Sequence, residues 1–178
     1  MGFTGLLGYD KQRARVEARA RIISDRRYER QRKWREAQMR AMEIDPNAPD
    51  TLGWRAWNWQ CGVLVSPLRR TPWHDAALKA EQWSDQQALR GEAGVHARRM
   101  PKDWLRVDAR WFPEIGRCDV HGIVERFGRY VLGTKGWRAE WVVIRELMAP
   151  DTETALELMQ RYPDVKVHVR KEANHEDR

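Results

Sequence analysis

Residues 125–141 read ERFGRYVLGTKGWRAEW, and this stretch predicts the centre of the fold. The Gly-Thr-Lys-Gly sequence at 133–136 is typical of a tight two-residue turn between antiparallel strands. On both sides of the turn, apolar and charged residues alternate, as they do in strands with one buried face. We therefore predict a hairpin with strands at 120–132 and 137–147.

The turn fixes which residues of the two strands lie opposite each other, because a slip of one residue would move every side chain to the other face. With Thr134 and Lys135 in the turn, Leu132 faces Trp137 and Gly128 faces Trp141. This face is almost entirely apolar, so we expect it to be the core. Gly128 would leave room there for the Trp141 ring.

The opposite face of the same hairpin places Arg129 across from Glu140. If solvent covers this face, the alternation only reflects a half-buried strand, and each ion pair contributes about 0–1 kcal/mol. If another element covers it, the charges form a buried network or a ligand pocket. The candidate ligand pocket consists of Glu125, Arg129, Arg138 and Glu140.

The segments around the hairpin complete an α+β pattern. Asp151 or Thr152 predicts the start of a helix that Pro163 ends, and the strand 165–169 follows it. Upstream, WRAWNW at 54–59 and VLVSP at 63–67 predict a second hairpin. A short helix after Ser84, ending at Gly91, and a strand in AGVHA come between the hairpins. The predicted fold is a curled, mostly antiparallel sheet or partial barrel with packed helices, preceded by a long basic N-terminal helix.

The long basic helix is predicted for residues 10–44, with Asp10 as its cap and Asp45-Pro46 as its end. The net charge of the chain is +7, and residues 11–40 hold 12 Lys and Arg against four Asp and Glu. The rest of the chain holds 21 basic and 22 acidic residues, so all the excess positive charge lies in this helix. Its apolar stripe is thin, and we expect it to be only partly docked.

Two interpretations of this helix stay open. It binds nucleic-acid phosphates or an acidic partner, or it is a solvated helix whose acidic residues pair with its basic ones. Arginine dominates its basic residues, which favours binding, because the guanidinium group suits phosphate. The candidate contact residues are Arg13, Arg15, Arg19, Arg26, Arg27, Arg30 and Lys33.

The chain is expected to divide into three parts. Residues 1–50 form the basic helical arm and its linker, residues 51–172 form a compact domain rich in tryptophan, and residues 173–178 form a polar tail. We expect the compact part to fold without the arm, because few contacts should cross the linker. No apolar run approaches the ~20 residues that cross a bilayer, and no secretory signal is recognised, so a cytoplasmic location without membrane contact is expected. Cys61 and Cys118 are expected to be buried thiols.

The motifs GWRAW, GVHARR and GIVERFGRYVLGTKGWRAEWVVIREL together resemble an uncharacterised domain family of bacterial and phage-borne proteins, over residues 53–148. The resemblance implies a phage or mobile-element setting. It implies no activity, cofactor or catalytic residue.

Sequence templates for enzymes are missing: there is no Walker loop, no dinucleotide-binding glycine motif, no H-E-x-x-H, no C-x-x-C and no nucleophile elbow. An acid–base pair of His96 or His121 with Glu125 or Asp119 is conceivable, and a metal site of His121, Asp119 and His96 less so. Scattered histidines are more often structural, so no cofactor is expected.

Three hypotheses follow. The first is a non-catalytic phage or mobile-element protein that binds nucleic acid or a host nucleoprotein or defence complex, as an anti-defence inhibitor would. The second is a binder of a small nucleotide signal. The third is an enzyme with an unrecognised site.

Overall fold

The computed structural model describes residues 6–81, 83–90, 92–108 and 118–170, and the side chains from residue 15 onward. The predicted tail at 173–178, Gly91 and the Arg13 side chain lie outside the described residues. The chain divides into two compact units, Met1–Arg40 and Ala41–Arg178.

The first unit is a single helix, α1, which spans Leu6–Ala41 and is 36 residues long. At ~1.5 Å per residue its length is about 54 Å. The predicted cap was wrong, because residues before Asp10 are already helical. The helix also ends before the expected Asp45-Pro46 stop. Glu43 and Asp45 hydrogen-bond through their backbones to Lys102 and Met100, which draws the chain out of the helix.

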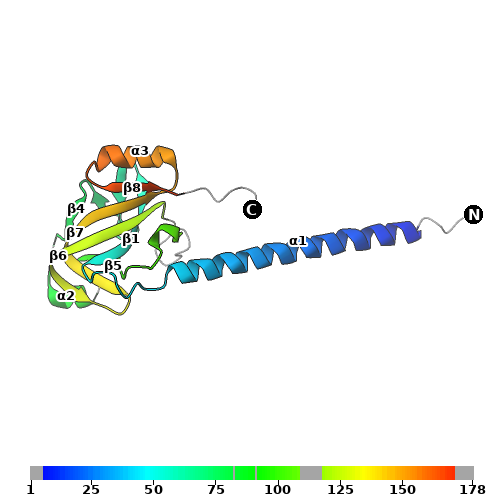
Figure 1. The fold of residues 1–178 in the computed structure, drawn as a ribbon, viewed down its shortest axis with the longest axis horizontal. Coiled ribbons are helices and arrows are strands. Elements are labelled where there is room, and N and C mark those ends of the chain that lie inside the picture. The colour runs from blue at the N-terminus through cyan, green and yellow to red at the C-terminus, as the bar shows by residue number, and fades with distance from the viewer. Residues whose placement is uncertain (1–5, 82, 91, 109–117, 171–178) are drawn as a thin grey trace, which may run out of the picture. The chain divides into compact units, whose positions relative to one another are not determined.

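The second unit is an α+β domain built on an eight-stranded, mostly antiparallel sheet (Figure 1). Among the described strands, only β8 runs parallel to its neighbour, β7. The strands are β1 Leu52–Gln60, β2 Val63–Val65, β3 Pro72–Trp73, β4 Ala77–Lys79, β5 Val95–Arg98, β6 Val120–Leu132, β7 Gly136–Ala149 and β8 Lys166–Val169. The helices are α2 Asp85–Leu89, the 3-10 helix Trp104–Arg106 and α3 Thr152–Arg161.

Four strands of this sheet form a partial ring. Strand β1 pairs with β6, β6 pairs with β7, and β7 pairs with β5. The ring closes through one residue pair between β5 and β1, Trp54 with Arg98. Gly136 allows the close approach of β5 to β7, because a Cβ atom there would lie 2.0 Å from the Ala97 carbonyl oxygen. The predicted fold class, a curled sheet with packed helices after a long basic helix, is confirmed.

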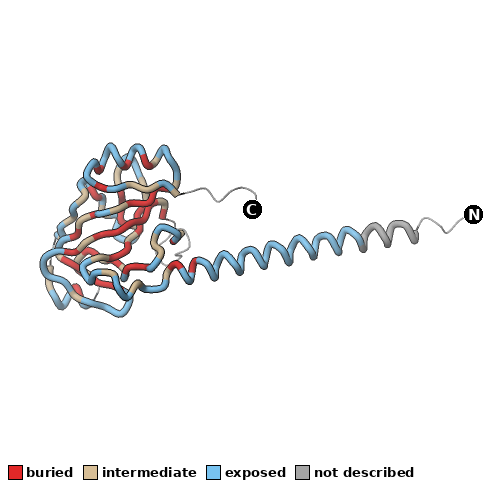
Figure 2. The backbone as a smooth tube through the Cα atoms, in the orientation of Figure 1, coloured by how far each residue is buried: buried red, intermediate tan, exposed pale blue. Residues whose placement is uncertain are grey.

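Strand β1 separates two hydrophobic cores. Trp57 faces the larger core, which lies between the ring and α3, and Trp54 faces a smaller core on the other side. Both indole rings are almost fully buried. Figure 2 shows the buried segments gathered in the middle of the sheet, whereas the outer side of α3 is exposed.

The central hairpin has the predicted register at both ends but not in the middle. Leu132 faces Trp137 and Tyr130 faces Ala139, as expected, and Gly122 faces Leu147, also as expected. In between, the pairing is shifted by one residue: an extra residue in β6 makes a β-bulge between Phe127 and Tyr130, and a second irregularity between Ile123 and Val124 restores the predicted register.

The assignment of the core face was wrong in part. Phe127, and not Gly128, lies opposite Trp141. Trp141 is 40% exposed, Tyr130 46% and Leu132 59%, while Trp137 and Ala139 are buried.

Helix α3 and its surroundings follow the sequence pattern. The Asp151 carboxylate caps the helix by accepting a hydrogen bond from the Thr154 amide at 2.8 Å. After the helix, Tyr162 is buried and donates its hydroxyl proton to the Trp73 carbonyl at 2.6 Å. The helix packs beside β8 and β7 (Figure 1).

Candidate nucleic-acid interface

Helix α1 presents its basic residues to solvent. Residues 15–37 are all exposed, including Val16 and Ile23, which are more than 60% exposed. Residues three, four and seven apart lie on one face of a helix. Five of the predicted contact residues follow this spacing and form a continuous basic stripe: Arg15, Arg19, Arg26, Arg30 and Lys33.

The other two predicted contact residues are not part of the stripe. Arg27 lies about a quarter turn away at 100° per residue, and the side chain of Arg13 is not described. Acidic residues are interleaved, as expected. Lys33 Nζ lies 3.5 Å from Glu29 Oε1, and an exposed pair of this kind contributes about 0.3–0.5 kcal/mol.

The four charged residues of the predicted pocket do not form one site. Arg129 and Glu140 do pair, with Nε 3.2 Å from Oε2 and Nη2 3.4 Å from Oε1. The hydrogen bond from Arg129 lowers the pKa of Glu140. The two residues meet beside the bulge and are not direct cross-strand partners.

The remaining two charges of that set lie elsewhere. Glu125 forms an ion pair with Arg145: Arg145 Nη2 lies 2.6 Å from Glu125 Oε2. Arg138 is partly buried beside His96 on the neighbouring strand, and its Nη1 lies 3.5 Å from the Ala93 carbonyl. Phosphate recognition by Arg129 and Arg138 together is therefore not favoured.

A half-buried cation that the sequence analysis missed lies at the edge of the ring. The Arg55 guanidinium donates to the His96 carbonyl and to Ser66 Oγ, the latter at 2.8 Å. Its Cζ also lies 5.4 Å from the centroid of the Trp73 ring. Burial, together with the charge of Arg138, lowers the pKa of Arg55 to about 10. Strands β1 and β5 pair at one position only, Trp54 with Arg98. Beyond that pair, Arg55 connects the two strands through its hydrogen bond to the His96 carbonyl.

The two histidines considered for acid–base chemistry are held neutral. Burial and the Arg170 charge lower the pKa of His121 to about 3. Its Nε2 donates to the Trp104 carbonyl at 3.2 Å, so the proton is on that nitrogen. Burial and the Arg138 and Arg55 charges lower the pKa of His96 to about 4.

Within the described ranges, no three His, Cys, Asp or Glu side chains gather as a metal site would require. The trio of His121, Asp119 and His96 is therefore not assembled. The cysteine prediction was wrong in part: Cys118 is buried, but Cys61 is exposed in the β1–β2 turn.

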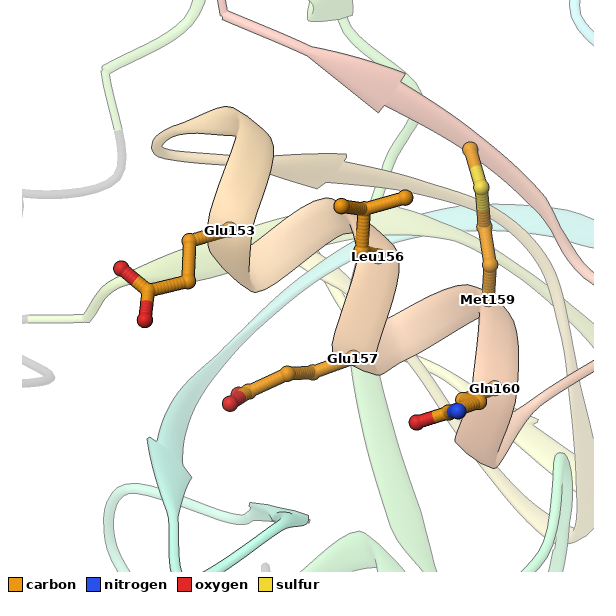
Figure 3. Close-up of a pocket in the computed structure, with 5 residues that line it drawn as sticks. All are labelled: Glu153, Leu156, Glu157, Met159 and Gln160. Carbon is orange, nitrogen blue, oxygen red and sulfur yellow. The ribbon is translucent and has the colours of Figure 1, made fainter.

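A surface depression lies on the outer side of α3, lined by Glu153, Leu156, Glu157, Met159 and Gln160 (Figure 3). Its side chains come from successive turns of one helix and point outward. Glu157 accepts a hydrogen bond from Trp59 Nε1 at 2.7 Å. Two carboxylates beside a leucine and a methionine give no site for a phosphate.

No protein-family model matches this chain, and neither a curated protein nor a solved structure matches it significantly. The resemblance to a phage-borne domain family therefore stays an expectation. Among the helices in the described segments, none has both the length and the apolar character that crossing a membrane requires.

Proposed function

We propose that this chain binds nucleic acid through the basic stripe of α1, without catalysis or a cofactor. The observation that carries the proposal is the concentration of all the excess positive charge on one exposed 36-residue helix. The rest of the chain has no bulk attraction for phosphate. A phage or mobile-element setting, with a host nucleoprotein or defence complex as the target, is the wider proposal and is supported only by the sequence resemblance.

The stripe has the dimensions and chemistry for tracking a phosphate backbone. From Arg15 to Lys33 it covers about 27 Å at ~1.5 Å per residue, which is long enough to meet several phosphates. Four of its five cations are arginines, whose planar guanidinium groups bind phosphate oxygens in pairs. No fold feature directs these side chains toward base edges, so we expect little sequence preference.

Salt dependence of duplex DNA binding tests the proposal. Five phosphate contacts give a slope of about −4.5 for log K against log salt, so a threefold rise in salt weakens binding on the order of a hundredfold. The triple variant Arg19→Gln, Arg26→Gln and Arg30→Gln removes three contacts. Its slope should fall to about −1.8, as measured by fluorescence anisotropy between 50 and 200 mM salt, roughly the range in which such binding is lost.

A matched control removes the same charge from another face of α1. Arg21, Arg32 and Arg35 lie off the stripe, and their replacement by glutamine also removes three positive charges. This control should keep a slope near the wild-type value. Equal losses in the two triple variants would show that only net charge matters, and no salt-dependent binding by the full chain would refute the proposal.

The alternative of a small nucleotide-signal binder has less support. It would need Arg129 and Arg138 to face one pocket, but Arg129 pairs with Glu140 and Arg138 is directed to the Ala93 carbonyl. Ligand-dependent tryptophan fluorescence would favour it over the helix.

A further inference from the structure

Three adjacent strands bring two aromatic rings together on the outer face of the sheet. In β4, β7 and β6, the residues Lys79, Trp141 and Phe127 are consecutive register partners. Partners in antiparallel strands project on the same face. Phe127 is 43% exposed and Trp141 40%, so both rings meet solvent in the second unit.

Each ring has a cation beside it. Lys79 Nζ lies 5.0 Å from the centroid of the Trp141 ring, and Arg145 Cζ lies 5.7 Å from that of the Phe127 ring. A base that stacked on either ring would therefore place its phosphate near a positive charge. Rings combined with cations are the usual composition of surfaces that bind single strands.

The carboxylates on this face are already paired. Glu125 accepts a hydrogen bond from Arg145 Nε at 2.7 Å, and Glu140 is paired with Arg129. Arg129 Cζ also lies 5.9 Å from the Trp83 ring, which extends the alternation of rings and cations along the surface. Arg145 and Glu125 compensate each other's charge, as do Arg129 and Glu140, and Lys79 adds a further positive charge beside the Trp141 ring.

The β-bulge determines which residues meet on this surface. From the pair Tyr130–Ala139 to the pair Phe127–Trp141, β6 advances by three residues and β7 by two, so the extra residue lies in β6 and places Phe127, and not Gly128, opposite Trp141. Phe127 therefore points away from the core, beside Trp141 and Lys79, and its exposed ring is available to a ligand.

We propose that this outer face, defined by Lys79, Phe127, Trp141 and Arg145, binds single-stranded nucleic acid by stacking unpaired bases on its two rings. The proposal rests on the proposed function for its class of ligand but uses a different surface. In a duplex the bases are stacked on each other and cannot stack on a protein ring, whereas a single strand can offer them. The helix would then attract any nucleic acid, and the sheet would select the unpaired form.

The test compares a thymidine oligonucleotide with an abasic oligonucleotide of the same length, using the full chain. The two share their phosphates, so a difference in affinity measures base stacking. Since one stacked base contributes a factor of about 5 to 150, we expect the full chain to bind the thymidine oligonucleotide at least roughly tenfold more tightly. Phe127→Leu and Trp141→Leu should each reduce that preference about fivefold or more, and the double variant should abolish it.

Tyr130→Leu is the matched control. Tyr130 is a ring of similar exposure in the same hairpin, but the Arg126 guanidinium covers it, with Cζ 3.2 Å from the ring centroid, so its loss should leave the preference unchanged. As a measurement that needs no variant, photocrosslinking of wild-type protein to an oligonucleotide containing 5-iodouracil should label Phe127 or Trp141. Labelling confined to α1 would overturn the inference.

The outcomes separate the two proposals. Equal binding of thymidine and abasic strands with a normal salt slope would refute the sheet surface and leave the helix proposal standing. Conversely, a preference that depends on Phe127 and Trp141, with a salt slope that the stripe variant does not change, would refute the helix proposal and support the sheet surface.

Discussion

His121 shows how a single polar residue is made structural by its surroundings. It is fully buried between the Trp54 and Trp104 rings, at centroid distances of 5.8 and 6.1 Å. Burial and the positive charge of nearby Arg170 both disfavour protonation of His121. Its role is therefore to join the 3-10 helix to β6, through the Trp104 carbonyl.

This burial predicts acid sensitivity. The pKa of His121 is about 3 in the folded chain against ~6.5 when unfolded, so the unfolded chain binds more protons between these values. The free energy of unfolding should therefore fall as pH falls below about 6.5, with His121 contributing up to ~1.4 kcal/mol per pH unit. His121→Gln can still donate to Trp104 but cannot be protonated. Urea unfolding at pH 6, 5 and 4 should give the variant a flatter pH dependence, and parallel curves would contradict this.

Among the secondary-structure elements, the bulge in β6 has the largest consequences. Gly128 lies within it and has φ +72, a conformation that residues with a Cβ atom rarely adopt. The Cβ position itself is not severely crowded, with the flexible Glu140 carboxylate at 3.3 Å and Trp141 Cδ1 at 3.5 Å. Glycine is therefore required at position 128 because of its positive φ angle, more than because a Cβ atom would crowd Trp141.

Two substitutions of similar size separate these reasons. Gly128→Val should lower the free energy of unfolding by about 1–3 kcal/mol, because a β-branched residue is strained in the left-handed region. Gly128→Asn should cost less than half as much, since asparagine tolerates that region. Urea unfolding measures both. Equal losses would indicate overpacking against Trp141, as the sequence register implied.

For the whole molecule, the division between the two units bears on how the arm can be removed. The sequence places the boundary after residue 50, whereas the compact units divide at Arg40 and Ala41. Residues 41–45 belong to the second unit: Ala41 is buried there, and Ile44 forms a β-bridge with Pro101.

Truncation at the two positions should therefore give different results. Removing residues 1–40 should leave the melting of the second unit unchanged, while the salt-dependent DNA binding proposed for α1 is lost. Removing residues 1–50 also deletes backbone hydrogen bonds to Met100 and Lys102, and should cost about 2–4 kcal/mol at ~1 kcal/mol for each bond plus lost apolar burial. Thermal melting of the two truncated chains measures the difference. Identical melting would show that residues 41–50 do not stabilise the domain.

Elements whose signals are local could be predicted from the sequence. The long basic helix, the hairpin turn at 133–136 and the capped helix α3 each follow from periodicity, turn residues or a capping side chain within a few positions. The charge of α1, and so the proposed contact residues, could also be found from composition alone.

The faces of these elements that are buried could not be predicted in the same way, because they depend on distant strand partners. Strand β7 pairs with β5 along one part of its edge and with β4 along the next, and the local alternation of residues does not identify those partners. The outward position of Trp141 and the bridging position of Arg55 follow from the same distant pairings. A strand's pattern shows that it has two faces, but the strands and helices that pack on it determine which face is the core.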